Sequence, residues 1–179
     1  MRNPKQELRP TPLIQSKINM RKTAKACRAI IHERICIEAS EKISRHIEDF
    51  LISQNDFEII AVYAPIQTEI DIWPVIPKIR ALGKTLCLPT VIANDKPLSF
   101  LVWNEHSELV EDKFRVLIPV SNQSIQPDLV LCPMLSFDTR GYRLGYGGGF
   151  YDRTVDHLSK AKSIFVLGCA YSEQIAKGL

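Results

Sequence analysis

The sequence predicts an α/β fold with a mainly parallel central sheet. Short apolar runs rich in β-branched residues alternate with segments whose apolar residues recur at helical intervals. The length of 179 residues suits one domain, and 45% hydrophobic with 24% charged residues is typical of a globular protein. We expect residues 1–16, which contain several prolines, to form a flexible leader, and residues 17–179 to form a single domain.

A long helix is expected over about 17–53. No proline or glycine occurs between Ser16 and Pro65, and the apolar residues of this stretch follow a mostly helical period. Ser16 has a side chain suited to an N-cap, and Cys36 marks a candidate break in the helix.

A buried strand is expected at 57–63, where the sequence is Phe-Glu-Ile-Ile-Ala-Val-Tyr. The residues Thr68–Asp71 then have the pattern of a capping box, which predicts a helix from there to about Leu82. Pro77 is a candidate kink in this helix, and Gly83 is its expected end.

Three charged residues of this half are candidates for ligand binding. Lys17 and Arg21 are four residues apart and share one helix face, which fits either a solvated face or a phosphate clamp. Glu69 follows the first strand, and open α/β sheets bind ligands at the carboxyl ends of their strands. The same position also fits a carboxylate that complements a helix N-terminus.

The second half of the chain is expected to complete the sheet. It contains strand-like runs at 85–89, 98–103, 129–132 and 163–170, a loop at 134–142 and a helix over about 149–158. Pro127 and Pro133 flank the run at 129–132, as suits the two ends of a strand.

The most distinctive stretch is 141–153, with the sequence Gly-Tyr-Arg-Leu-Gly-Tyr-Gly-Gly-Gly-Phe-Tyr-Asp-Arg. Four of the eight glycines of the chain fall within five positions here. Closely spaced glycines let backbone N–H groups converge on an anion, and the expected helix start adds its own amides. Asp152 fits a ligand of a phosphate-bound metal or a carboxylate that complements the helix dipole. Arg143 fits a phosphate contact or a surface charge.

The stretch matches neither of two common nucleotide-binding motifs. It lacks the Gly-Lys-Ser/Thr ending of a Walker A loop, and the last glycine of a dinucleotide-binding fingerprint is replaced by Phe150. A glycine-rich surface loop without a ligand is the alternative that the spacing leaves open.

Composition excludes several classes of function. The net charge of +3, with no basic stripe interleaved with aromatic residues, argues against nucleic-acid binding. The five cysteines form no Cys-x-x-Cys pair, which favours free thiols in a reducing compartment over a disulfide framework. No apolar run reaches the ~20 residues that span a membrane, and no apolar signal core is present. We therefore expect a cytoplasmic protein that binds neither nucleic acid nor a membrane.

The stretches 127–138 and 141–153 together resemble the 5-formyltetrahydrofolate cyclo-ligase family, also called methenyltetrahydrofolate synthetases. Three further landmarks occur in the family's order. They are Lys17-x-x-x-Arg21, Tyr63-Ala-Pro-Ile-Gln-Thr-Glu-Ile70 and Tyr171-Ser-Glu-Gln-Ile175. The resemblance covers about residues 17–176 and implies a catalytic domain folded as a three-layer α/β/α sandwich. We expect a monomer.

The resemblance implies an ATP- and Mg²⁺-dependent closure of 5-formyltetrahydrofolate to 5,10-methenyltetrahydrofolate, with release of ADP and phosphate. It assigns ATP binding to Lys17, Arg21, Arg143, Leu144, Gly145, Tyr146, Gly147, Gly148, Gly149, Phe150 and Tyr151. It assigns folate binding to Arg21, Glu69, Tyr146, Gly147, Gly148, Gly149 and Phe150. Asp152 would bind Mg²⁺. No covalent protein nucleophile is needed, so we expect Cys132 to be a core residue of its strand.

The sequence departs from the family pattern at two places. Family members usually continue past the position of Leu179 into a segment that supplies a second magnesium contact, and the stretch 114–119 lacks the glutamate that many relatives place before its proline. A non-catalytic relative that binds folate or nucleotide is therefore the alternative function.

Overall fold

A five-stranded sheet forms the centre of the fold in the computed structural model, which describes residues 11–176. Its strands lie in the order β3 (Leu98–Val102), β2 (Thr85–Val91), β1 (Ile59–Ala61), β6 (Leu129–Pro133) and β9 (Phe165–Cys169). All neighbouring pairs are parallel except β2 and β3, which are antiparallel. The predicted α/β fold with a mainly parallel sheet is confirmed.

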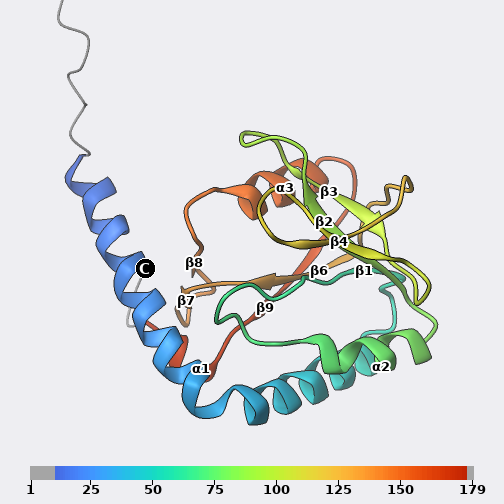
Figure 1. The fold of residues 1–179 in the computed structure, drawn as a ribbon, viewed down its shortest axis with the longest axis horizontal. Coiled ribbons are helices and arrows are strands. Elements are labelled where there is room, and N and C mark those ends of the chain that lie inside the picture. The colour runs from blue at the N-terminus through green and yellow to red at the C-terminus, as the bar shows by residue number, and fades with distance from the viewer. Residues whose placement is uncertain (1–10, 177–179) are drawn as a thin grey trace, which may run out of the picture.

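Helices cover both faces of the sheet. Figure 1 shows α1 (Pro12–Ser53) and α2 (Ile76–Ala81) on one side of the strands and α3 (Phe150–Leu158) on the other. Because successive strand residues point to opposite faces, each strand contributes to both cores. Ile60 and Leu129 belong to the larger core with α1 and α2, whereas Ala61 and Val130 pack with Leu158 of α3. These layers are those of the expected three-layer sandwich.

Helix α1 begins earlier than expected. Its N-cap is Thr11, whose Oγ1 accepts a 3.4 Å hydrogen bond from the Ile14 N–H, and Pro12 occupies the first helical position. Proline is tolerated there because its missing N–H would have no helical partner. The prediction of a leader over 1–16 with a cap at Ser16 is therefore wrong for residues 12–16, and residues 1–10 lie outside the described part of the chain.

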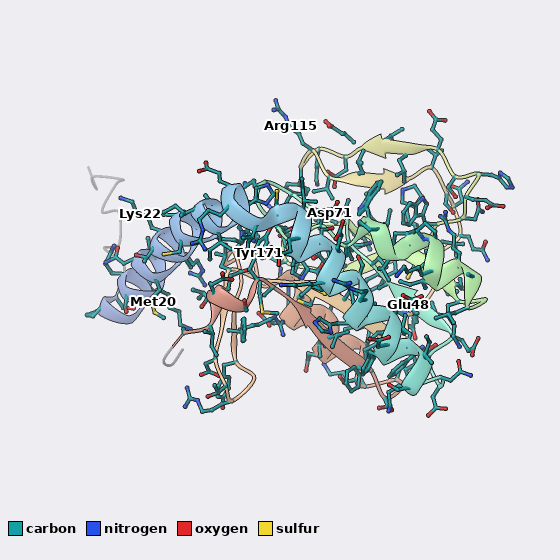
Figure 2. All side chains as sticks on the ribbon, turned by 90° about the horizontal axis from the view of Figure 1, so that it is seen from below. Met20, Lys22, Glu48, Asp71, Arg115 and Tyr171 are labelled. Carbon is teal, nitrogen blue, oxygen red and sulfur yellow. The ribbon has the colours of Figure 1, made fainter. Side chains whose placement is uncertain are left out.

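The helix is bent and not broken. Its helical assignment is continuous through Cys36 to Ser53, but in Figure 1 its first half and its second half run in different directions. Figure 2 shows the helix crossing most of the molecule, with Met20 and Lys22 in the first half and Glu48 in the second. The second half packs on the sheet through Ile47 and Leu51. The first half contacts the glycine-rich stretch through Arg21.

The predicted capping box at Thr68–Asp71 does not open a helix. A 3₁₀ turn, η1 (Trp73–Val75), leads into the short α2 (Ile76–Ala81), and the Trp73 N–H donates to Asp71 Oδ1 at 2.8 Å. The box fails because both of its members bond elsewhere: Thr68 Oγ1 accepts from Arg28 Nε at 3.1 Å, and Asp71 accepts from the Trp73 N–H. The Glu69 carboxylate between them turns inward and accepts from the Ile66 N–H at 3.0 Å. Gly83, at φ 75°, follows α2 as expected.

Two small hairpins were not predicted. Strands β4 (Leu109–Glu111) and β5 (Leu117–Pro119) pair beside the main sheet, and β7 (Ser136–Phe137) pairs with β8 (Arg143–Leu144) inside the expected loop. Strands of two or three residues carry too little alternation to be recognised. The last element is the 3₁₀ turn η2 (Ser172–Gln174). Within residues 11–176, no helix is long and apolar enough to cross a membrane.

Candidate functional site at the glycine-rich loop

The glycine-rich loop, Gly145–Gly149, connects β8 to α3. It lies near the carboxyl ends of β1 and β6, because Tyr146 accepts a hydrogen bond from Arg28. Arg28 also donates to Thr68, in the segment that follows β1, and to the Met134 carbonyl directly after β6. The chain passes from β1 to β2 on one side and from β6 to β9 on the other. The loop therefore stands at a topological switch point, where open α/β sheets bind their ligands.

Two glycines of the loop adopt conformations that other residues rarely adopt. Gly147 has φ 107° and Gly149 has φ 66°. A Cβ on Gly149 would lie 2.7 Å from Arg153 Nη1, and one on Gly147 would lie 3.2 Å from Arg21 Cζ. The loop is held in this shape by Arg153, whose Nη2 donates to the Gly148 carbonyl at 2.7 Å.

The N-terminus of α3 faces this loop without a side-chain cap. The N-cap residue is Gly149, which has no side chain to accept a hydrogen bond from the first N–H groups of α3. These N–H groups also have no acceptor within the helix. Such a terminus attracts anions. Asp152 lies in the first turn, is 76% exposed and forms an ion pair with Arg143 of β8. The predicted cation and carboxylate thus flank the loop from its two sides.

Helix α1 brings Arg21 onto the loop, as expected from the resemblance. Arg21 Nε donates to the Gly145 carbonyl at 3.0 Å, and its guanidinium lies beside Gly147. Lys17, one turn earlier, is exposed and has no hydrogen bond or ion pair with any described residue. The structure therefore brings Arg21 to the loop, whereas Lys17 makes no such polar contact with residues 11–176.

The other predicted residues of the loop differ in their surroundings. Leu144 is buried and its carbonyl accepts from the Leu135 N–H at 2.8 Å. Tyr151 packs against the core beneath α3, and Phe150 lies under the Arg153 guanidinium, 5.1 Å from its ring centre. Leu144 and Tyr151 therefore support the loop from below, whereas Phe150 lies at its edge.

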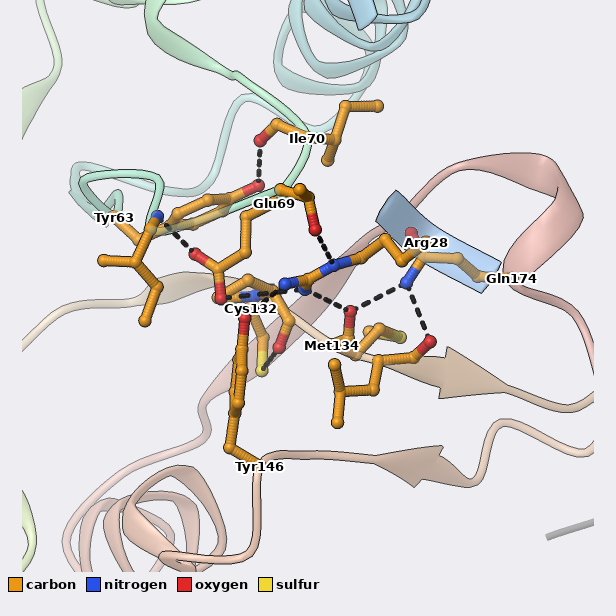
Figure 3. A network of polar contacts seen from close by, with 12 residues as sticks. Arg28, Tyr63, Glu69, Ile70, Cys132, Met134, Tyr146 and Gln174 are labelled. Carbon is orange, nitrogen blue, oxygen red and sulfur yellow. Dashed lines mark hydrogen bonds and ion pairs between the residues drawn. The ribbon is translucent and has the colours of Figure 1, made fainter. Parts of the chain in front are cut away.

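A buried arginine connects the loop to the strand ends (Figure 3). Arg28 of α1 is 1% exposed, and its Nη2 donates to the Tyr146 hydroxyl. Its Nε donates to Thr68 Oγ1 at 3.1 Å, and its Nη1 donates to the Met134 carbonyl at 3.2 Å. Glu69 Oε1 lies 4.0 Å from Nη1. Sequence reasoning missed Arg28, although its spacing of seven from Arg21 places both residues on one helix face.

Glu69 is a buried carboxyl group in this network. It is 4% exposed, and burial raises its pKa from the ordinary value of 4.5 to about 7. The Ile66 N–H, the charge of Arg28 and the Tyr146 hydroxyl act in the opposite direction. The turn that carries Glu69 is fixed by a 2.8 Å hydrogen bond from the Tyr63 hydroxyl to the Ile70 carbonyl. Near neutral pH this side chain can therefore exchange a proton or accept a hydrogen bond.

The cysteines near the site are unsuited to act as nucleophiles. Cys132 is fully buried in β6, as predicted, and burial raises its pKa to about 12. Burial also raises the pKa of Cys169 on the neighbouring β9. Because the thiolate is the reactive form, both thiols are inert at neutral pH. All five cysteines of the chain are free.

The residues present fit a magnesium ion only together with a ligand. Among residues 11–176, no three His, Cys, Asp or Glu side chains gather as a metal site. Mg²⁺ is commonly held by one or two carboxylates together with substrate phosphates. The exposed carboxylate of Asp152, beside a helix terminus suited to phosphate, matches that arrangement.

A groove of about 710 Å³ lies next to the site, between the first half of α1 and η2. Met20, Leu144 and Ile175 are among its lining residues. Neither Arg21 nor Tyr146 lines it, but Leu144, which supports the loop, does.

Comparisons with known proteins bear on the family and the fold. The family model described as "5-formyltetrahydrofolate cyclo-ligase family" matches residues 5–179. The 5-formyltetrahydrofolate cyclo-ligase of Haemophilus influenzae is 31% identical over 148 residues, which are 79% of this chain and 78% of the relative. The Escherichia coli enzyme of the same name is 32% identical over 126 residues, 67% of this chain and 69% of the relative. The structure of 5,10-methenyltetrahydrofolate synthetase from Aquifex aeolicus superposes with a TM-score of 0.76 at 30% identity, covering 91% of this chain and 81% of that one.

Proposed function

The chain belongs to the 5-formyltetrahydrofolate cyclo-ligase family, as an enzyme that converts 5-formyltetrahydrofolate to 5,10-methenyltetrahydrofolate, and we propose that it uses ATP at the glycine-rich loop to activate the formyl group. The observation that carries this proposal is the position of the loop. The loop contacts Arg21 and Arg28 of α1 through Gly145 and Tyr146, and it leads into the N-terminus of α3. Arg28 also lies 4.0 Å from the buried carboxylate of Glu69. In this proposal the same loop can therefore contact both the phosphates of ATP and the folate.

The reaction requires activation because a formyl amide is a weak electrophile whose oxygen leaves poorly. Transfer of the γ-phosphoryl group of ATP to the formyl oxygen gives an iminium phosphate and ADP. The N10 lone pair of the folate then attacks the formyl carbon, the ring closes, and the C–O bond breaks with the electron pair leaving on phosphate. The former formyl oxygen departs in the inorganic phosphate, and N10 loses its proton.

In this proposal the triphosphate lies along the glycine-rich loop. The N–H groups at the start of α3 and the guanidinium of Arg21 would neutralise the charge on the transferred group, which is the main task of a protein in phosphoryl transfer. Arg143 would turn from Asp152 to the phosphates, and Lys17, which is exposed one turn before Arg21, would reach the outer oxygens.

The folate would lie on the other side of the loop, against Glu69, Tyr146 and Phe150. Glu69 is buried and has a pKa of about 7, so it can hold a hydrogen bond to a pterin nitrogen in either protonation state. The ring of Tyr146 offers an apolar face. Gly147 and Gly148 allow the backbone to approach the formyl group closely.

Asp152 is the residue that would hold Mg²⁺, which when bound would offset the negative charge of the phosphates. The carboxylate is exposed and its ion-pair partner, Arg143, is itself a phosphate-binding candidate. Binding of the ion and release of the arginine toward ATP would then occur together.

The test is a coupled assay of the purified chain with Mg·ATP and 5-formyltetrahydrofolate. We expect the absorbance of the methenyl product to rise with one ADP formed per product molecule. Product formed equally well without ATP would contradict the proposal. Calorimetry that shows folate binding, while neither product nor ADP forms, would identify a non-catalytic binding protein instead.

A further inference from the structure

We propose that Arg28 is a positioning residue for the folate site, which holds the Tyr146 side chain and the Glu69 carboxyl group in the arrangement that receives the substrate. This inference rests on the proposed function, because it takes Tyr146 and Glu69 as folate contacts. Arg28 itself is 1% exposed and acts through these two neighbours.

The hydrogen bonds of Arg28 explain why an arginine is needed. The guanidinium donates to acceptors from three segments: Thr68 after β1, Met134 after β6 and Tyr146 in the glycine-rich loop. A planar guanidinium with donors in a fixed fork can fix three segments at once, which the single ammonium of lysine cannot. The Met134 carbonyl is held in turn by Gln174 Nε2 at 2.8 Å, so this anchor is itself rigid.

The burial of this cation has a stability cost that suggests a purpose beyond packing. All three of its hydrogen-bond acceptors are neutral, and the Glu69 carboxylate stays 4.0 Å away. Desolvating a charge whose counter-ion lies as far as 4.0 Å away is unfavourable, and hydrophobic replacements of buried ionic groups are often at least as stable. A core position that needed only packing would be better filled by an apolar side chain.

Tyr146 depends on Arg28 for its position because the two glycines beside it do little to restrict the backbone conformation. It is flanked by Gly145 and by Gly147, which has φ 107°. Its ring lies under two cations, with Lys25 Nζ 4.9 Å and Arg28 Cζ 5.3 Å from the ring centre. The hydrogen bond between Arg28 and the Tyr146 hydroxyl fixes the end of the side chain, so its loss removes the contact that orients the ring between two glycines.

Arg28 also sets the charge of Glu69. The titratable groups that interact with this carboxyl are Arg28, Tyr146, Tyr63, Tyr151 and Cys132. Arg28 is the cation among them and lowers the pKa of Glu69, whereas burial raises it. Removal of the guanidinium should therefore raise the pKa of Glu69 further and move the pH dependence of folate binding to higher pH.

The test uses Arg28→Lys, Arg28→Met and Tyr146→Phe, with Arg34→Lys as the matched control. Arg34 is an exposed arginine on the same helix. For each variant the KM values for 5-formyltetrahydrofolate and for ATP, the pH profile and the Kd for the folate by calorimetry are measured. Because Tyr146 lies in the loop and not in the core clusters, Tyr146→Phe keeps the test valid even where Arg28→Met fails to fold.

We expect Arg28→Lys and Tyr146→Phe each to raise the folate KM and Kd by on the order of 10-fold or more, as for loss of a hydrogen bond to a charged group. In Arg28→Lys the KM for ATP should change by less than about 2-fold. The double variant, Arg28→Lys with Tyr146→Phe, should be no worse than the poorer single one, because both substitutions remove the same contact. Folate Kd and KM unchanged in Arg28→Lys, with only a lower Tm, would overturn the inference. A wild-type chain that binds the folate but makes no product would refute the proposed turnover. The folate Kd of Arg28→Lys, compared with that of wild type, would then still test the role of Arg28. A wild-type chain that binds no folate would overturn both.

Discussion

The Nη2 of Arg28 donates to the hydroxyl of Tyr146, although one residue lies on α1 and the other in the glycine-rich loop, 118 positions later. With Arg21, which binds the Gly145 carbonyl, this contact attaches the first half of α1 to the loop at two points. The bend of α1 allows one helix to pack on the sheet and to reach the loop as well.

Arg21→Met should weaken the use of ATP more than the use of folate. The side chain supports the loop at Gly145 and presents its guanidinium beside Gly147. Loss of a preorganised donor typically lowers turnover by ~10²–10³-fold, and steady-state kinetics with both substrates measures it. Lys22→Met, at an exposed position next in the chain, is the control and should behave as wild type. Equal losses in the two variants would show that only the total charge of α1 matters.

Gly149→Ala should reduce ATP binding through the shape of the loop. Its φ of 66° is unfavourable for alanine, and the new Cβ would press on Arg153 Nη1 at 2.7 Å. Gly141→Ala is the matched control, because Gly141 has φ 87° but nothing within 4 Å of a Cβ. Both variants should lower the Tm by a few degrees, and only Gly149→Ala should raise the Kd for an ATP analogue. An equal Kd in the two would contradict the proposed phosphate site.

Asp152→Asn should raise the magnesium concentration needed for half-maximal rate. The amide keeps the shape of the side chain but removes the negative charge that a hard cation requires. Asp156→Asn, on an exposed turn of the same helix, controls for the general charge of α3. A magnesium titration that is the same for Asp152→Asn and wild type would rule out Asp152 as the ligand.

Glu69 should make the stability of the fold depend on pH. Its pKa is raised from 4.5 to about 7 in the folded state, so the folded chain binds the proton more tightly than the unfolded chain. Its contribution is therefore fully present below about pH 4.5 and is lost as the pH rises through about 7. Glu69→Gln, which cannot ionise, should gain in Tm relative to wild type across this window. A Tm difference that stays constant from pH 4.5 to 8 would contradict the raised pKa.

The sequence was informative where residue type and local spacing determine structure. The five strands of the main sheet, the glycine-rich loop and the start of α3 follow from apolar runs and clustered glycines. The family resemblance anticipated that Arg21 and Glu69 would lie near the loop. Their roles in binding remain predictions.

Long-range contacts explain what sequence reasoning missed. The capping pattern at Thr68–Asp71 misled because the Thr68 hydroxyl accepts from Arg28, 40 residues earlier in the chain, and not from the start of a helix. The role of Arg28 could not be predicted from local sequence, because its hydrogen-bond acceptors lie 40 or more residues away in the chain. The start of α1 at Pro12 was missed because proline, although it disfavours a helix interior, is compatible with the first helical position.

The most direct test of the central claim follows the formyl oxygen. The chain is incubated with Mg·ATP and 5-formyltetrahydrofolate carrying ¹⁸O in the formyl group, and the released phosphate is examined by mass spectrometry. Phosphorylation of the formyl oxygen predicts one ¹⁸O atom in each phosphate formed with the methenyl product. Product accompanied by unlabelled phosphate, with the label recovered in water, would contradict the account.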